Sequence, residues 1–238
     1  TAKAFAGEPT GDASFDAFSV VAHECGLTPA MAEDVIAGFA LDAEDWRPRT
    51  EADMMRYCYH VAGAVGVMMA VVMGVDPKDT DTLDRANDLG LAFQLSNIAR
   101  DIVEDDAAGR CYLPVEWLVE QDIEPGQHTK PHHREELAAM AARLVALGDK
   151  HEAAARVGAA RLPFHSRWAV LSAARIYGAI GRKVRARGTE AWNSRTYFPR
   201  WEKALYGART FLSAAINREK HPEGGIDWGI GDYRPDPA

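Results

Sequence analysis

The sequence predicts an all-α protein with one large helical domain. Alanine, leucine, methionine, arginine and glutamate recur at helical spacing through most of the chain, while segments that alternate apolar and polar residues are scarce. The 238 residues are enough for one sizeable core. No internal repeat and no low-complexity linker divides them, so a single domain is expected.

Apolar periodicity and helix-breaking residues place seven helices along the chain. Breaks are expected where proline or glycine interrupts the pattern, as at Pro29, Pro48, Pro77 and residues 109–114. The helices are predicted at residues 13–26, 28–44, 51–74, 80–106, 133–159, 163–188 and 198–219. The helical domain is therefore expected over residues 1–220, and the Gly- and Pro-rich residues 221–238 are expected to form an irregular tail.

Charge and cysteine content limit the partners and the compartment. With 27 Lys and Arg against 35 Asp and Glu, the formal charge of -8 argues against nucleic acid as a partner. A polyanionic substrate would need metal ions to bind such a chain. Cys25, Cys58 and Cys111 are widely spaced and follow no zinc-finger pattern, which indicates a reducing compartment and predicts a cytoplasmic location.

The uncharged run at residues 57–75 approaches the roughly 20 residues that span a bilayer. Its glycine, alanine and histidine content weakens the membrane signal and favours a buried helix of a soluble protein. The first residues also lack the basic region and apolar core of a cleavable signal peptide. Peripheral association with the inner face of a membrane is left open, as is the oligomeric state.

The helix expected at residues 80–106 carries its polar residues on one face. At 100° per residue, one arc of roughly 120° holds Ala86, Gly90, Phe93, Gln94, Asn97, Asp101, Glu104 and Asp105. Such an arc is either the solvent side of an amphipathic helix or the wall of a cavity. A solvent side usually mixes lysine with glutamate, whereas small residues, amides and acids gather here, which favours the cavity.

Asp101 and Asp105 lie one turn apart on this face, with β-carbons about 5–6 Å from each other. Their repulsion suits Mg²⁺, which takes oxygen ligands and is commonly shared between one or two carboxylates and substrate phosphates. The same DxxxD spacing occurs at Asp84 and Asp88. That pair is predicted to stabilise the start of the helix through its dipole.

The segment NIARDIVEDDAAGRCYLP, residues 97–114, resembles the second aspartate-rich motif of squalene and phytoene synthases. The resemblance implies that Asp101 and Asp105 bind Mg²⁺, or Mn²⁺ in its place. It also implies diphosphate contacts from Gln94, Asn97, Arg100, Arg110 and Tyr112. A purely structural role for Arg110 and Tyr112, closing the loop after the helix, is equally open.

Two further segments are similar to helices of the same family. YCYHVAGAVG, residues 57–66, resembles its tyrosine-containing helix and implies that Tyr57 lies near the reacting carbocation, where a π face stabilises positive charge. Apolar residues of the expected substrate wall are Val61, Ala64, Val65, Met68 and Phe93. The late segment PFHSRWAVLSAARIYGAIGRKV contributes Tyr177 as a substrate or diphosphate contact. The alternative for residues 57–66 is a tightly packed core helix without a substrate role.

The resemblance implies an isoprenoid-synthase-like helical bundle around a central cavity and a prenyltransferase of the phytoene synthase class. Two geranylgeranyl diphosphates would join head to head through prephytoene diphosphate to give phytoene, in carotenoid biosynthesis. No GxGxxG follows a strand, so no nicotinamide cofactor is expected. The alternatives are a squalene-type synthase and a non-catalytic helical protein that binds lipid or serves assembly. Prenyl chain length is not fixed, with Met68, Met69 and Phe93 as candidates for the residue that limits it.

The family pattern also contains a first aspartate-rich motif, and nothing before Tyr57 matches it. Residues 42–45 have the wrong spacing, and Asp42 resembles a separate family position. The chain is therefore expected to be incomplete at its N-terminus and nearly inactive by itself. His128, His132 and His133 gather in a Pro-containing segment that is predicted to be a solvated loop rather than a metal site.

Overall fold

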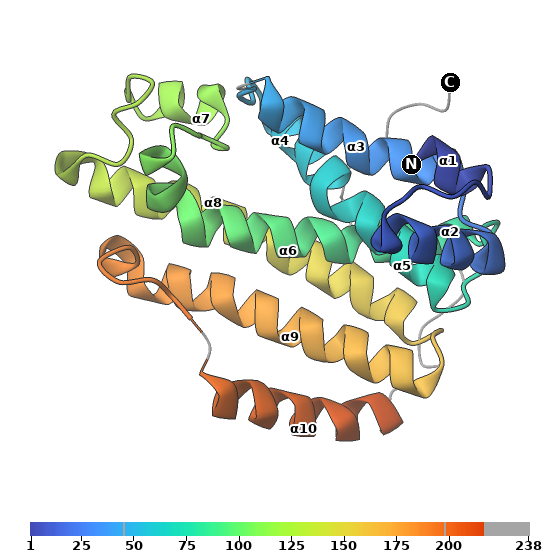
Figure 1. The fold of residues 1–238 in the computed structure, drawn as a ribbon. Coiled ribbons are helices and arrows are strands. Elements are labelled where there is room, and N and C mark those ends of the chain that lie inside the picture. The colour runs from blue at the N-terminus through green and yellow to red at the C-terminus, as the bar shows by residue number, and fades with distance from the viewer. Residues whose placement is uncertain (45, 198, 217–238) are drawn as a thin grey trace.

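The computed structural model describes residues 1–44, 46–197 and 199–216, and every regular element within them is helical (Figure 1). This confirms the all-α prediction for that part of the chain. The α-helices are α1 (Ala2–Phe5), α2 (Ala13–Cys25), α3 (Pro29–Ala43), α4 (Glu51–Cys58), α5 (Ala64–Val72), α6 (Thr80–Ala107), α7 (Val115–Glu120), α8 (Arg134–Ala159), α9 (Phe164–Arg187) and α10 (Arg200–Ile216). Short 3₁₀ turns cover Pro131–His133 and Gly188–Glu190.

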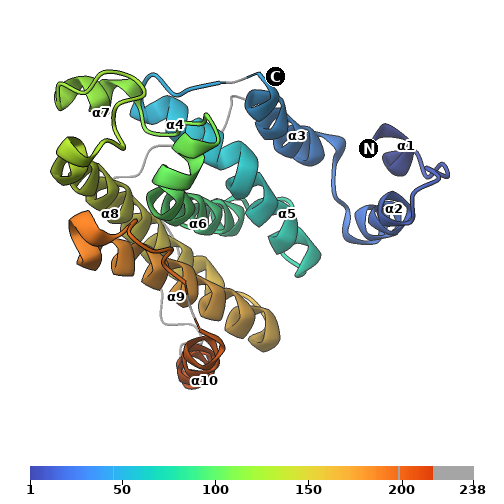
Figure 2. The same cartoon turned by 60° about the vertical axis from the view of Figure 1, so that its left-hand side comes forward.

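The bundle is organised around α6 and α8, which pack antiparallel along most of their length. Gly148 of α8 lies beside Leu95 of α6, and Gly158 lies beside Arg85, so the two chain directions are opposed. α9 covers one side of this pair and carries α10 on its outer face, while α3, α4 and α5 lie on the other side (Figures 1 and 2). α1 and α2 pack together at the edge next to α5. This arrangement leaves one face of α6 between α5 and α9.

All seven predicted helices are present, with ends within about two residues wherever both ends are described. α1 and α7 were not predicted, because four and six residues are too short to show a helical period. Residues 217–219 of the last predicted helix and the predicted tail at 221–238 lie outside the described residues.

The predicted helix at residues 51–74 is interrupted by a π-helical turn at Tyr59–Gly63, between α4 and α5. Such a turn accommodates one extra residue. The residues after it therefore face a different side from the one that a continuous α-helix of this sequence would give them. Small residues let this region approach α6 closely. A β-carbon on Gly90 would lie 2.3 Å from the carbonyl oxygen of Ala62, and one on Gly66 would lie 2.4 Å from that of Ala86. Only glycine allows this spacing at both positions.

The stretch Glu51–Val72 is long and apolar enough to cross a membrane by length and composition. Half of its most apolar window is buried inside the fold, where α5 and the π-helical turn pack against α3 and α6. The core helix of a soluble protein has the same composition, so the helix by itself is weak support for a membrane span.

The predicted role of Asp84 and Asp88 at the helix start is wrong. α6 begins at Thr80 and is capped by Asp79, whose side chain accepts a hydrogen bond from the Thr82 amide at 3.1 Å. The DxxxD pair therefore lies one to two turns inside the helix. Asp88 is buried and accepts hydrogen bonds from Arg85 at 2.6 Å and from Nδ1 of His151 at 2.9 Å. Spacing alone did not distinguish a first-turn acid from this buried ion pair between α6 and α8.

The prediction of a solvated loop is wrong for His128, whose side chain is buried. Its Nε2 lies 3.8 Å from a carboxylate oxygen of Asp106, and the neighbouring Thr129 hydroxyl donates to that carboxylate at 2.5 Å. Burial lowers the pKa of His128. The segment therefore packs against the end of α6 as part of the fold.

Candidate functional site

A polar pocket of about 260 Å³ lies beside the C-terminal half of α6. Its lining residues are Asp42, Tyr57, Gln94, Asn97, Ile98, Arg100, Asp101, Asp105, Arg110 and Tyr112. The structure thus brings together both predicted metal ligands, all five predicted diphosphate contacts and Tyr57. The α6 members share one face because they recur at intervals of three and four residues, and Arg110 and Tyr112 return to that face from the loop after the helix.

The two predicted metal ligands differ in their surroundings. Asp101 is paired with Arg100, at 2.7 Å from Nε, and with Arg195 at 3.3 Å. Asp105 lies one turn further along, where burial and the charge of Asp101 raise its pKa to about 6. A carboxylate that is costly to ionise beside a second carboxylate is stabilised by a bound cation. The pair therefore fits Mg²⁺ on the chemistry of its oxygen donors.

Within the described residues, no three His, Cys, Asp or Glu side chains are grouped as a metal cluster. Two carboxylates are nevertheless consistent with Mg²⁺, which keeps several waters and is commonly completed by substrate phosphates.

Asp42, at the end of α3, organises the aromatic side of the polar pocket. Its carboxylate accepts hydrogen bonds from the hydroxyls of Tyr57 at 3.0 Å and Tyr112 at 2.9 Å. The two tyrosine rings stack with centroids 4.9 Å apart, and Trp46 stacks on Tyr57 at 5.4 Å. Burial and the neighbouring Tyr112 raise the pKa of the Tyr57 phenol, so this hydroxyl stays protonated as a donor. Sequence reasoning assigned Asp42 no role here, although its resemblance to a family position was a usable signal.

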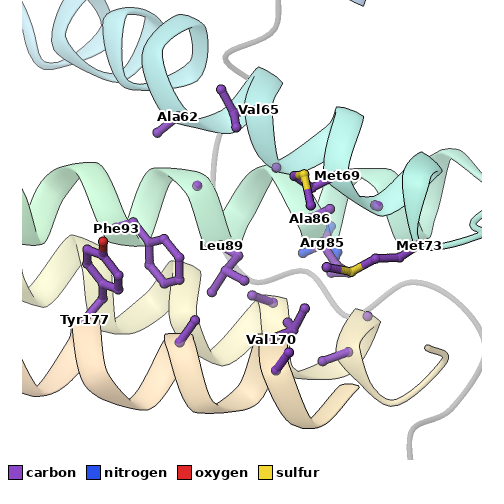
Figure 3. Close-up of a pocket in the computed structure, with 18 of the residues that line it drawn as sticks. Ala62, Val65, Met69, Met73, Arg85, Ala86, Leu89, Phe93, Val170 and Tyr177 are labelled. Carbon is purple, nitrogen blue, oxygen red and sulfur yellow. The ribbon is translucent and has the colours of Figure 1, made fainter. Parts of the chain in front are cut away.

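An apolar cavity of about 470 Å³ continues from this pocket between α5, α6, α8 and α9 (Figure 3). Its walls are mostly aliphatic, with Met69 from α5, Leu89 from α6 and Val170 from α9 among them. Gln94 and Asn97 line both the cavity and the polar pocket. The two spaces therefore meet at these two amides, on a single face of α6.

Phe93 and Tyr177 form an aromatic wall near this junction. Their rings stack at 4.1 Å with an interplanar angle of 19°, one from α6 and the other from α9 (Figure 3). Both line the cavity. The sequence had suggested Phe93 for the substrate wall and Tyr177 as a contact to substrate or diphosphate.

Of the residues predicted for the wall, Val61 and Val65 line the cavity, whereas Ala64 and Met68 do not. Ala64 is buried in the main core, and Met68 packs against the apolar cluster between α2 and α5. The π-helical turn is the physical reason, because its extra residue shifts the inward face by one position. The wall after the turn is formed by Val65, Gly66, Met69, Ala70 and Met73.

Comparison with known proteins agrees with these features. The squalene/phytoene synthase family matches residues 1–202. The 15-cis-phytoene synthase of Enterobacter agglomerans is 50% identical over 182 residues, which cover 76% of this chain and 61% of that protein. The 15-cis-phytoene synthase of Pantoea ananas is 46% identical over 195 residues, covering 82% and 62%.

Solved structures share the fold. A dehydrosqualene synthase in complex with ligand superposes with a TM-score of 0.78 at 25% identity, covering 90% of this chain and 75% of that one. The squalene synthase HpnC from Alicyclobacillus acidocaldarius gives a TM-score of 0.69 at 22% identity, covering 79% and 70%, and supports the fold alone. The chain spans about three fifths of the length of the curated relatives it matches. From the family match and these relatives, the chain belongs to the squalene/phytoene synthase family.

Proposed function

We propose that the protein containing this chain is a prenyltransferase that joins two geranylgeranyl diphosphates head to head to form phytoene. The observation that carries the proposal is the junction at Gln94 and Asn97, where a pocket with acids and arginines opens into a long apolar cavity. A prenyl diphosphate has this shape and polarity. The names of relatives at 46–50% identity support the choice of phytoene as product.

The polar pocket would hold the diphosphate. The guanidinium of Arg110 is exposed at the pocket, near Tyr112 and Asp42, which raise its pKa, and it can reach phosphate oxygens. The amides of Gln94 and Asn97 can donate hydrogen bonds to the diphosphate where the polar pocket meets the apolar cavity. Asp101 and Asp105 would hold Mg²⁺, which supplies positive charge against the departing diphosphate.

The cavity would protect the reacting carbon from water. Its aliphatic walls exclude nucleophiles, and the stacked rings of Phe93 and Tyr177 lie where positive charge would develop next to the diphosphate. Tyr57 lies on the polar side of the junction, with its hydroxyl on Asp42 and its ring against Tyr112. We propose that it contributes to cation stabilisation from that side.

Binding of geranylgeranyl thiolodiphosphate, a non-ionising analogue, tests the proposal on this chain without requiring turnover. We expect binding that depends on Mg²⁺ and falls at least tenfold in Asp101→Asn and Asp105→Asn. Glu104→Gln is the matched control, because Glu104 lies on the same helix, pairs with Arg195 and does not line the pocket. Metal-independent binding, or equal binding by all three variants, would contradict the proposal and favour a non-catalytic lipid-binding protein.

We further propose a cytoplasmic location. Cys25, Cys58 and Cys111 are free thiols in the structure, which suits a reducing compartment. Cell fractionation tests this, and recovery of the protein from an oxidising compartment would refute it.

A further inference from the structure

The apolar cavity has a defined far end, opposite the polar pocket. There the end of α5 meets the start of α6 and the connection between α8 and α9. The lining residues at this end are Met73, Thr82, Arg85 and Leu162 (Figure 3 labels Met73 and Arg85). Two of the four are polar, whereas the middle of the cavity is lined by aliphatic and small side chains.

The polar residues of this end are held in place by partners outside the cavity. Arg85 donates to Asp88 at 2.6 Å, and Asp88 also accepts from the buried His151. The Arg85 stem is fixed against α8 at Gly158, where an added β-carbon would lie 2.3 Å from the Arg85 β-carbon. A hydrocarbon tail offers nothing to replace the Arg85–Asp88 ion pair, so it cannot displace this side chain without separating Arg85 from the buried Asp88.

Thr82 is fixed in a similar way. Its hydroxyl accepts a hydrogen bond from Arg161 at 2.9 Å, and Arg161 also pairs with Asp81 at 2.5 Å. Leu162 follows directly and is buried. The far end is therefore a wall whose polar members are tied to α6, α8 and the connection after α8, and whose apolar members, Met73 and Leu162, line the cavity.

The length of α6 between the junction and this wall measures the cavity. Asn97 and Thr82 are 15 residues apart (97 − 82) on one continuous helix, which corresponds to about 22 Å at the helical rise. An extended isoprene unit adds four carbon–carbon bonds to a chain, or about 5 Å at ordinary bond lengths and angles. Four units need about 20 Å, and five need about 25 Å.

From this comparison we propose that the wall formed by Met73, Thr82, Arg85 and Leu162 is the stop that limits the substrate tail to four isoprene units. The inference rests on the proposed function, since it assigns the cavity to a prenyl tail. It replaces the candidates drawn from the sequence. Phe93 lies at the junction, Met69 lies along the side, and Met68 does not line the cavity.

The test is the affinity of the full chain for thiolodiphosphates with three, four and five isoprene units, each with Mg²⁺. The unaltered chain should bind the four-unit compound best and the five-unit compound at least tenfold more weakly. Leu162→Ala and Met73→Ala remove bulk from the wall and should each strengthen five-unit binding about tenfold relative to four-unit binding. Using two variants from different segments of the chain, after α5 and between α8 and α9, protects the result against misfolding of either one.

A variant in the opposite direction sharpens the test. Ala169 lines the cavity on α9 and is exposed rather than packed in the core, so Ala169→Met should add bulk to the cavity and shift preference towards three units. Leu89→Ala is the matched control, because Leu89 lies midway and its loss should weaken four- and five-unit binding by the same factor. If both wall variants bind the analogues with the same preference for chain length as the unaltered chain, the proposal that this wall limits the tail is wrong. Failure of every length to bind overturns the proposed function and this inference with it.

Discussion

The polar pocket and the apolar cavity share α6 but are built in different ways. Most of the pocket comes from one continuous stretch, from Gln94 to Tyr112, so its members are fixed by the period of one helix and the loop that follows. The cavity takes its walls from four helices, and their faces depend on one π-helical turn and on close contacts at glycine. The placement of the pocket residues therefore depends little on how the helices pack, whereas the shape of the cavity depends directly on that packing.

Inserting one alanine after Gly66 should separate the two regions most strongly. The insertion lies beyond the π-helical turn and rotates the rest of α5, with Met69 and Ala70, by about 100° relative to α4. We expect geranylgeranyl thiolodiphosphate to bind about a hundredfold more weakly, since a long apolar tail loses one wall of its cavity. Inorganic diphosphate with Mg²⁺, measured by calorimetry, should bind as before. Equal losses for both ligands would show that the pocket depends on the α5 register as much as the cavity does.

Gly90→Ala tests the close contact between α6 and the π-helical turn. The new methyl group would lie 2.3 Å from the Ala62 carbonyl oxygen, so the helices must separate, at a cost of about 1–3 kcal/mol in the free energy of unfolding. Denaturant unfolding measures it. The control is Gly207→Ala on α10, where nothing lies within 4 Å of the added carbon and the expected change is neutral or slightly stabilising. Similar effects at both positions would argue against the close contact.

The aromatic wall at the junction should couple α6 to α9. Phe93→Leu removes the stacking of two rings at 4.1 Å and should cost about 0.5–1.5 kcal/mol beyond the lost area. Tyr177→Phe keeps the ring and should leave stability within about 0.5 kcal/mol. A double-mutant cycle on Phe93→Leu and Tyr177→Leu measures the pairing directly. A coupling energy of zero would mean that the two rings contribute only as separate apolar groups.

The smallest expected effect concerns the stability cost of the charged pocket. The pKa of Asp105 is raised to about 6 in the fold, from an ordinary value of 3.8. A carboxyl group that ionises less readily in the folded state destabilises the fold above pH 6, and this penalty disappears as the pH falls below 4. Without divalent cations, Asp105→Asn should therefore raise the midpoint of thermal unfolding by a few degrees at most at pH 7.5, and not at pH 4. A lower midpoint of thermal unfolding at pH 7.5 would show that ionised Asp105 stabilises the fold, contrary to this prediction.

The sequence predicted most of what depends on local order. The seven long helices follow from apolar periodicity, and the residues from Gln94 to Tyr112 share a face because the period of α6 requires it. The shift from Met68 to Met69 could not be predicted in this way, because one extra residue in a helical turn leaves no distinct sequence pattern.

Contacts between residues far apart in the sequence also could not be predicted. Asp88 has the same DxxxD spacing as the pocket pair, and only the packing of α8 gives it His151 as a partner. Asp42 joins the pocket because α3 ends beside Tyr57 and Tyr112, 15 and 70 residues further along the chain. Such pairs are set by tertiary packing, which a helical period does not contain.

The junction between the polar pocket and the apolar cavity should keep the same charge over a wide range of pH. Gln94 and Asn97 carry amides, which neither gain nor lose a proton in ordinary buffers. While neighbouring carboxyl groups titrate, this boundary keeps the same hydrogen-bonding capacity and no net charge. A carboxylate at either position would repel an anionic head group whenever it ionised. The two neutral amides therefore keep the boundary between the polar pocket and the apolar cavity uncharged as the pH changes.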